Sequence, residues 1–190
     1  MPIEASYKTY YGIHLNHYDY DWAGETYNKI LTQEYPSDEL VSTASTQASS
    51  AVFIYPRLVG NPCYIDGLAE GHFTLFNSSS AASSTVSTYT VSLMKTNDVP
   101  ENETIIGTYT YTLTADNIIW KSGEVSDDGF NSDVLVLPIY MPIVEQRVDV
   151  DEKLLLKIEY TSSSGTVWIG HYNGGDPDDI KFRIPYTPTG

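Results

Sequence analysis

From residue 51 onward the chain reads as one β-strand after another. Apolar and polar positions alternate in several runs, and a period of two is typical of a strand with one buried face. In residues 108–114 the side chains of Tyr109, Tyr111 and Leu113 fall on one face and threonines on the other. Residues 85–95 alternate in the same way. Both runs predict half-buried strands.

The other runs are shorter and more apolar. Residues 118–121 and 134–140 are apolar on both faces, which predicts central strands packed between two layers. The remaining runs cover residues 51–59, 71–76, 154–160, 166–172 and 180–186. Turn-forming residues recur at intervals of about ten positions, which is typical of a β-sandwich or barrel. We therefore expect an all-β fold of about eight or nine strands.

The first fifty residues follow a different pattern, with few aliphatic and many aromatic side chains. A small polar stretch, residues 42–50, separates them from the strands. This change predicts an N-terminal arm or lid with little regular structure over residues 1–50, and a β-sandwich domain over residues 51–190. The spacing of apolar side chains in residues 26–34 suits one short helix.

Tyrosine is the most informative residue type. The chain has 16 Tyr and 3 Trp but only 5 Phe. Tyrosine combines a large apolar ring with a polar tip and is favoured at protein interfaces. We predict that the arm binds a partner through its aromatic side chains, namely Tyr7, Tyr10, Tyr11, Tyr18, Tyr20 and Trp22. The alternative is a platform for stacking sugars, with Trp22, Trp120 or Trp168 as its face, although a core position is the simpler interpretation for the last two.

The net charge of −15 narrows the range of partners. An acidic chain repels nucleic acid phosphates and anionic lipid headgroups, so we expect neither nucleic acid nor membrane as a partner. No apolar run reaches the length of a membrane span, and the N-terminus lacks the pattern of a secretory signal. The single cysteine, Cys63, excludes an intrachain disulfide.

Two segments of the chain contain residues that could bind a metal. Residues 127–133 have the composition of a calcium loop, with Asp127, Asp128, Asn131 and Asp133 as the candidate ligands. The order of these residues does not match an EF-hand, and a solvated turn is the competing interpretation. A zinc site at His14 and His17 has no second ligand cluster in its favour. No cofactor other than calcium is expected.

The chain carries none of the short motifs of common enzymes. It lacks G-x-S-x-G, H-E-x-x-H and the Walker A loop. Cys63 lies between Pro62 and Tyr64, a setting that suits a small core residue better than a nucleophile. From these observations we predict a protein that works by binding rather than by catalysis.

Residues 151–186 carry a resemblance to a known class of proteins. The stretch DEKLLLKIEYTSSSGTVWIGHYNGG and the short strand after it resemble the closing strands of jelly-roll modules in the virions of tailed viruses. These modules serve as capsid decoration and minor capsid proteins. The resemblance implies an antiparallel β-sandwich of jelly-roll type. It lies in the rhythm of strands and turns, so no site residue is carried over.

The resemblance implies a virion structural protein that binds the capsid or tail surface and stabilises or decorates it. The expected partners are a major capsid protein or another virion protein, together with further copies of this chain, a trimer being favoured. The expected location is the virion, after synthesis in the host cytoplasm without a signal peptide. The alternative function is a carbohydrate-binding or adhesin β-sandwich module, which would bind a glycan.

Overall fold

The computed structural model describes most of the chain, in twelve segments. These are residues 6–14, 20–22, 25–34, 44–46, 49–56, 61–77, 86–97, 102–114, 121–125, 131–162, 167–171 and 180–188. Within these segments the backbone forms strands and turns, with no α-helix. The predicted all-β fold is confirmed.

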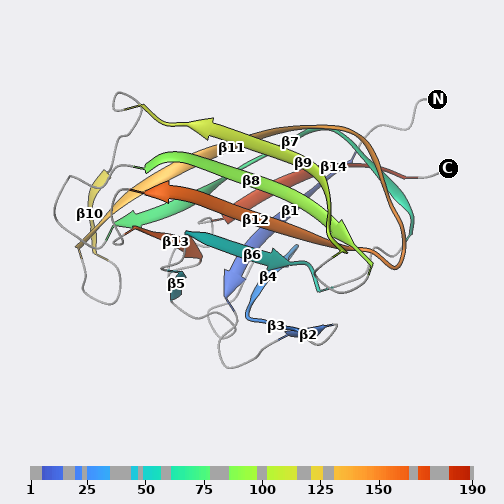
Figure 1. Ribbon diagram of the computed structural model, residues 1–190, viewed down its shortest axis with the longest axis horizontal. Helices are drawn as coiled ribbons and strands as arrows, with labels where there is room; N and C mark the ends of the chain where they lie inside the picture. The colour runs from blue at the N-terminus through green and yellow to red at the C-terminus, as the bar shows by residue number, and fades with distance from the viewer. Residues whose placement is uncertain are drawn as a thin grey trace.

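Fourteen strands account for most of the described residues (Figure 1). They are β1 (Ser6–His14), β2 (Tyr20–Trp22), β3 (Glu25–Tyr27), β4 (Lys29–Thr32), β5 (Ala44–Thr46), β6 (Ser50–Ile54), β7 (Cys63–Asn77), β8 (Val86–Thr96), β9 (Thr104–Thr112), β10 (Lys121–Val125), β11 (Asn131–Val148), β12 (Lys153–Ser162), β13 (Val167–His171) and β14 (Ile180–Pro188). Strands β2 and β3 form a small hairpin of their own, and the other strands share one large sheet.

The large sheet folds over to make the two layers of a sandwich of jelly-roll type. Its hydrogen-bonded order is β10-β11-β7-β14-β1-β4-β6-β12-β8-β9, with β13 and β5 joined to β7 at the side. Strands β4 and β6 meet at a single parallel pair, Ile30 opposite Ile54, while the other pairings are antiparallel. One layer thus holds β11, β7, β14 and β1, and the facing layer holds β6, β12, β8 and β9.

The core lies between these layers. Phe73 of β7 meets Tyr89 of β8 edge to face, with ring centroids 5.2 Å apart. Leu154, Leu156 and Ile158 of β12 are fully buried in this core. Leu155, on the other face of β12, is buried in a second cluster with Ile54 and Met94. Burying an aliphatic side chain of this size contributes about 1.5–3 kcal/mol relative to leaving it exposed. The alternating runs of the sequence therefore form strands because one face of each packs into this core.

The segment predicted to be an arm supplies strands to the large sheet. Strand β1 pairs with β14 on one side and with β4 on the other. Tyr10 is 1% exposed, and its hydroxyl lies 2.6 Å from the Tyr186 hydroxyl and accepts a hydrogen bond from Gln33. The aromatic residues of this segment therefore do not all form a contact surface, because at least one of them is a core side chain of the sandwich.

The short helix expected over residues 26–34 is replaced by strands β3 and β4, so that prediction is wrong. The apolar residues of this segment are buried in a strand instead of a helix, because β4 pairs with β1 and Leu31 becomes completely buried. Tertiary pairing overrides a weak local preference here. Across the described segments, no helix is long and apolar enough to cross a membrane.

Candidate binding surface

An exposed apolar face runs along strand β11. Leu135, Leu137, Ile139, Met141 and Ile143 point into the core and are buried. The side chains between them point outward and are apolar as well. Val136 is 51% exposed, Tyr140 53% and Val144 81%, and the prolines that alternate with them are also exposed. The strand is therefore apolar on both faces, as the sequence indicates, but one face meets solvent instead of a second layer.

The neighbouring strand β7 extends this face. Leu68 is 41% exposed and lies opposite Pro142 in the register of β7 and β11. We use the name β11 stripe for the set formed by Leu68, Val136, Pro138, Tyr140, Pro142 and Val144. Polar residues border it: Glu70, opposite Tyr140, forms an ion pair with Arg183 of β14 at 3.0 Å. A contiguous apolar patch with a polar rim is typical of an interaction site.

Strands β9 and β11 face each other across a seam between the two layers, and in the described part of the chain they are not paired as neighbouring strands (Figure 1). Gly107 of β9 packs directly on β11: a Cβ atom at this position would lie 2.7 Å from Met141 Sδ and 2.9 Å from Ile143 Cγ1. Only glycine allows the two strands to approach this closely without displacing their side chains.

A cluster of tyrosines closes the seam. The Tyr89 hydroxyl donates a hydrogen bond of 2.6 Å to the carbonyl oxygen of Pro138, from β8 to β11. The Tyr109 ring packs against Tyr111 at 6.3 Å and against Tyr140 at 6.4 Å, between ring centroids. Burial, and after it the neighbouring tyrosines, raise the pKa of Tyr89 above its usual value, so the hydroxyl keeps its proton. The seam is therefore an aromatic surface that continues into the β11 stripe.

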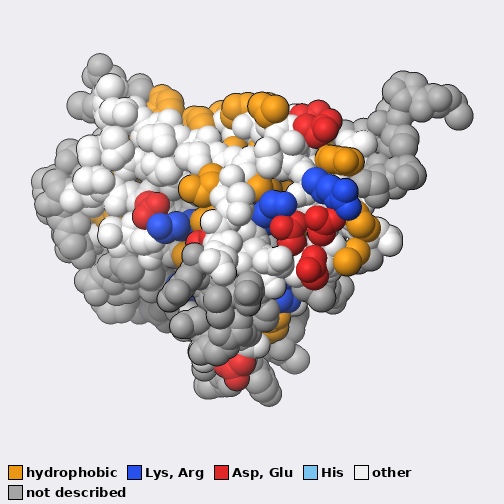
Figure 2. All heavy atoms as spheres, turned by 45° about the vertical axis from the view of Figure 1, so that its right-hand side comes forward, with side chains coloured by type: hydrophobic (Ala, Val, Ile, Leu, Met, Phe, Trp, Pro, Cys, Tyr) orange, Lys and Arg blue, Asp and Glu red, His pale blue; other side chains and the backbone are white. Residues whose placement is uncertain are grey.

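Figure 2 shows hydrophobic side chains gathered along the upper border of the molecule, where β9 and β11 lie in Figure 1. Most acidic and basic side chains lie lower on the same view, and one acidic group lies at the right-hand end of this border. The exposed apolar residues on β9 and β11 are Ile105, Tyr111, Val136, Tyr140 and Val144. Most of the large apolar side chains that the described residues expose thus lie at this one border.

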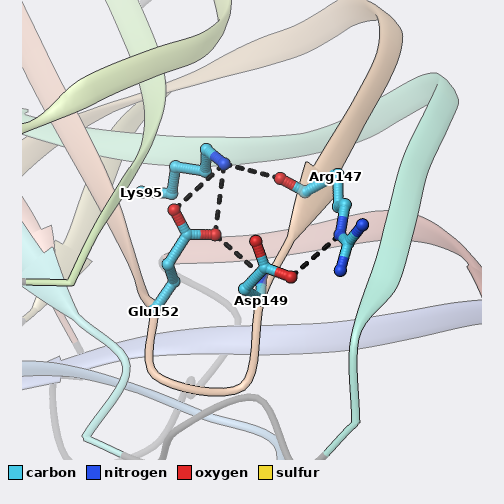
Figure 3. Close-up of polar contacts among 4 residues, drawn as sticks. All are labelled: Lys95, Arg147, Asp149 and Glu152. Atoms are coloured by element: carbon cyan, nitrogen blue, oxygen red, sulfur yellow. Dashed lines mark hydrogen bonds and ion pairs between the residues drawn. The ribbon is translucent and has the colours of Figure 1, made fainter.

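A polar cluster at the turn from β11 to β12 has a structural role (Figure 3). Lys95 Nζ donates to the Arg147 carbonyl oxygen at 2.6 Å and forms an ion pair with Glu152 at 3.0 Å. Glu152 also accepts a hydrogen bond from the Asp149 backbone N–H, and Asp149 pairs with Arg147 Nε at 2.8 Å. These two cations and two carboxylates pair with one another, so the cluster fixes the turn against β8.

The predicted partner-binding residues lie in different surroundings. Tyr7 is exposed and stacks on Arg183, while Tyr11 and Tyr20 are half-buried. The Tyr20 hydroxyl donates to the Pro56 carbonyl oxygen. Tyr10 is buried and has no surface to offer a partner. Tyr18 lies outside the described residues, as do the side chains of Trp22 and Trp168 and the whole of Trp120. Partner binding by these residues stays a prediction.

The candidate calcium ligands do not form a described site. Asp127 and Asp128 lie outside the described residues, and Asn131 and Asp133 are placed only as backbone positions at the start of β11. Among the described residues, no group of three or more His, Cys, Asp or Glu side chains is arranged to hold a metal. Calcium binding at residues 127–133 stays a prediction.

Cys63 is buried at the start of β7, and burial raises the pKa of its thiol. A thiol that keeps its proton is a poor nucleophile. This environment agrees with the sequence-based interpretation of Cys63 as a core residue.

Sequence reasoning missed the β11 stripe, although a signal was present. Residues 134–144 are uncharged and apolar on both faces, which predicted a central strand. The same run contains Pro138 and Pro142. Proline cannot donate to a ladder of hydrogen bonds and is confined to sheet edges and bulges. Two prolines at a spacing of four should have indicated an edge strand with an exposed apolar face.

Comparison with known proteins adds a fold likeness. The sequence matches no protein-family model and no curated protein. The structure is similar to a CocE/NonD family hydrolase from Staphylococcus aureus, with a TM-score of 0.53 and 13% identity over 96% of this chain and 37% of that chain. It is also matched, with TM-scores of 0.39 and 0.36, to an aminopeptidase from a marine sediment Thaumarchaeota archaeon and to Eiger TNF from S. frugiperda. The chain spans between 24% and 37% of the hydrolase and aminopeptidase structures.

This likeness corrects one prediction. The sequence predicts a protein that is not an enzyme, but this prediction is wrong by the fold likeness, because a solved structure of similar fold is a hydrolase. The absence of short catalytic motifs was a weak basis for that exclusion, because a β-sandwich of this kind occurs as a part of a hydrolase chain. At 13% identity the likeness shows the fold alone, and it assigns no role to any residue of this chain.

Proposed function

We propose that this protein is a docking module of a virion, a capsid decoration or minor capsid component that attaches to a larger protein surface through the β11 stripe. The observation that carries the proposal is the exposed apolar face of β11 in a chain with a net charge of −15. No charged residue occurs between Val134 and Val144. An exposed strand face that long and that free of charge is disfavoured in water unless a partner covers it.

The composition of the stripe suits a protein partner. Tyr140 offers an aromatic anchor of the kind that dominates binding at interfaces. Val136, Pro138 and Pro142 surround it with rigid apolar contacts, and the Glu70–Arg183 pair supplies a polar rim. A hydrophobic centre with a polar border is the usual anatomy of a protein interface. The proposed partner is a major capsid protein or another virion protein, presented in many copies so that avidity strengthens each contact.

The proposal is tested by mixing the labelled protein with purified particles that lack it. Saturable binding to the particles is expected. The variant Val144→Asp places a charge in the stripe and is expected to weaken binding about tenfold or more, because an unpaired carboxylate must then be desolvated. Val150→Asp is the matched control: it changes an exposed valine in the turn after β11, outside the stripe. Particles that bind none of these proteins, or bind Val144→Asp as tightly as wild type, would contradict the proposal.

The fold likeness favours a second candidate function. The chain covers 37% of a CocE/NonD family hydrolase, so the second candidate is that this sandwich itself takes part in hydrolysis. The test is hydrolysis of a panel of chromogenic model esters by the purified chain, with a heat-denatured sample as the control. Turnover that scales with protein concentration would support the second candidate. Saturable binding to particles without ester turnover would support the first.

A further inference from the structure

Strand β9 presents an open hydrogen-bonding edge at the end of the large sheet. Among the described strands, β9 pairs with β8 alone. The Leu113 N–H donates to the Ser87 carbonyl oxygen at 2.8 Å, so the backbone of Leu113 faces β8. Backbone N–H and C=O groups alternate in direction along an antiparallel strand. The groups of Tyr109 and Tyr111 therefore also face β8, and those of Thr108, Thr110 and Thr112 face away from it.

The side chains confirm this assignment. Thr110 lies opposite Thr90 in the register, and their hydroxyl oxygens are 3.1 Å apart. Directly opposite residues come closest in the pairs that do not exchange backbone hydrogen bonds. Thr90 and Thr110 form such a pair, which again directs the Thr110 N–H and C=O to the open edge. The strand thus offers a row of donors and acceptors from its threonines.

The usual protections of a sheet edge are missing from β9. Natural edges carry charged residues, prolines or bulges that prevent pairing with another strand. Residues 104–114 contain neither a charged residue nor a proline. The one register shift lies near Gly107, before the row of threonines begins. In a protein with 25 acidic residues, an uncharged strand of this length is a place where two copies can approach without repulsion.

We propose that β9 pairs in antiparallel fashion with β9 of a second copy, and so joins two sandwiches through one continuous sheet. With Thr110 opposite Thr110, each Thr108 lies opposite Thr112 on the outer face and each Tyr109 lies opposite Tyr111 on the inner face. The strand already makes the same kinds of pair with β8, namely Thr88 with Thr112 and Tyr89 with Tyr111. Cross-strand pairs of threonines and of aromatic residues stabilise sheets.

This contact is isologous and closes with two copies. It differs from the trimer that the sequence-based expectation favoured. It uses different groups from the β11 stripe, namely the backbone of β9 in place of side chains of β11 and β7, although Tyr140 of the stripe contacts Tyr109 of β9. The failure of one proposal would leave the other in place.

The experiment is light scattering coupled to size exclusion over a series of protein concentrations. Wild type is expected to move from monomer to dimer as its concentration rises. Thr110→Pro removes the central edge donor from each copy without removing a donor to β8, and is expected to weaken the dimer about 30-fold. Thr110→Lys places two cations face to face and is expected to weaken it as well. The matched control, Thr90→Lys, adds the same charge to the same face one strand away from the edge.

Circular dichroism and a melting curve establish whether each variant is folded. If Thr110→Pro does not fold, Thr110→Lys tests the dimer in its place. The register is tested separately with nitroxide labels. Cys63 is buried, so Thr110→Cys adds an accessible thiol on the edge. Strong dipolar broadening is expected at position 110 and weaker broadening for Thr90→Cys. A wild-type chain that remains monomeric, or a dimer that Thr110→Lys leaves as tight as wild type, would overturn the proposal.

Discussion

Strands β9 and β11 lie on the two sides of the same seam, but their free edges differ in the backbone N–H groups that they offer. The Pro138 carbonyl oxygen accepts a hydrogen bond from Tyr89 across the seam, so the backbone of Pro138 faces away from β7. Pro142, four residues on, faces the same way. Proline has no N–H, so this edge of β11 lacks two donors. The corresponding row of β9 is made of threonines and keeps its donors.

The comparison shows how one sandwich separates two kinds of contact. On β11, prolines block the addition of a strand, and the exposed side chains form an apolar face for docking. On β9, the outer face is covered by hydroxyl groups and the backbone stays open for pairing. A strand edge with unpaired backbone N–H groups binds another strand, whereas an exposed apolar face binds a surface of complementary shape. The following predictions test this difference, from the largest expected effect to the smallest.

Alkaline pH is expected to destabilise the sandwich as a whole. Burial raises the pKa of Tyr10 to about 12 and also raises the pKa of Tyr186, with which it shares a hydrogen bond. Both phenols keep their protons in the folded protein and lose them near pH 10 when unfolded. The free energy of unfolding should therefore be constant below about pH 10 and fall between about pH 10 and 12, by about 3 kcal/mol from Tyr10 alone.

Urea denaturation at a series of pH values measures this loss. Tyr10→Phe should flatten the alkaline decline, and Tyr7→Phe, which changes an exposed side chain, should leave it unchanged. An unfolding free energy that rises above pH 10 would show that the buried phenols do not govern alkaline stability.

The substitution Gly107→Val tests whether the seam is closely packed. Its side chain must enter space occupied by Met141 and Ile143, and overpacking of this kind costs about 2 kcal/mol. Thr108→Val is the neighbouring control and should change the free energy of unfolding by less than about 0.5 kcal/mol, because Thr108 points outward. Equal stability of the two variants in urea would mean that β9 and β11 are not in contact at Gly107.

The substitution Tyr89→Phe removes the hydrogen bond that joins the layers at the seam. It leaves the Pro138 carbonyl without this donor, so a loss of about 1–2 kcal/mol in unfolding free energy is expected. Tyr140→Phe removes a hydroxyl from an exposed ring of the same cluster and serves as the control, with a change close to zero. Should Tyr140→Phe prove the more costly change, the assignment of the bridging hydroxyl would be incorrect.

Replacing Pro138 and Pro142 by threonine converts the edge of β11 to the chemistry of the β9 edge. The effect on unfolding free energy should be small, below about 0.5 kcal/mol, because both residues are exposed. Self-association should increase, since two edge donors are restored. The same replacement at Pro185, which is buried in β14, gives no edge donor and is the control. If light scattering shows that the double variant associates no more than wild type, the prolines do not prevent strand pairing at the β11 edge.

The alternating runs predicted several strands because a half-buried strand must repeat with a period of two. The pattern of residues 108–114 places Tyr109, Tyr111 and Leu113 on the inner side of β9, as the structure does. The pattern of β11 was less informative, because periodicity does not report whether an apolar face has a partner layer. The core position of Tyr10 was also not predictable, since it depends on the pairing of β1 with β14 at the other end of the chain.

Hydrogen exchange at individual amides of β9, measured by NMR at low and high protein concentration, tests the open edge most directly. The amides of Tyr109 and Tyr111 should exchange slowly at both concentrations, because they face β8. The amides of Thr108, Thr110 and Thr112 should exchange rapidly in dilute solution and become protected as the concentration rises. Protection of all five amides that does not depend on concentration would contradict the account.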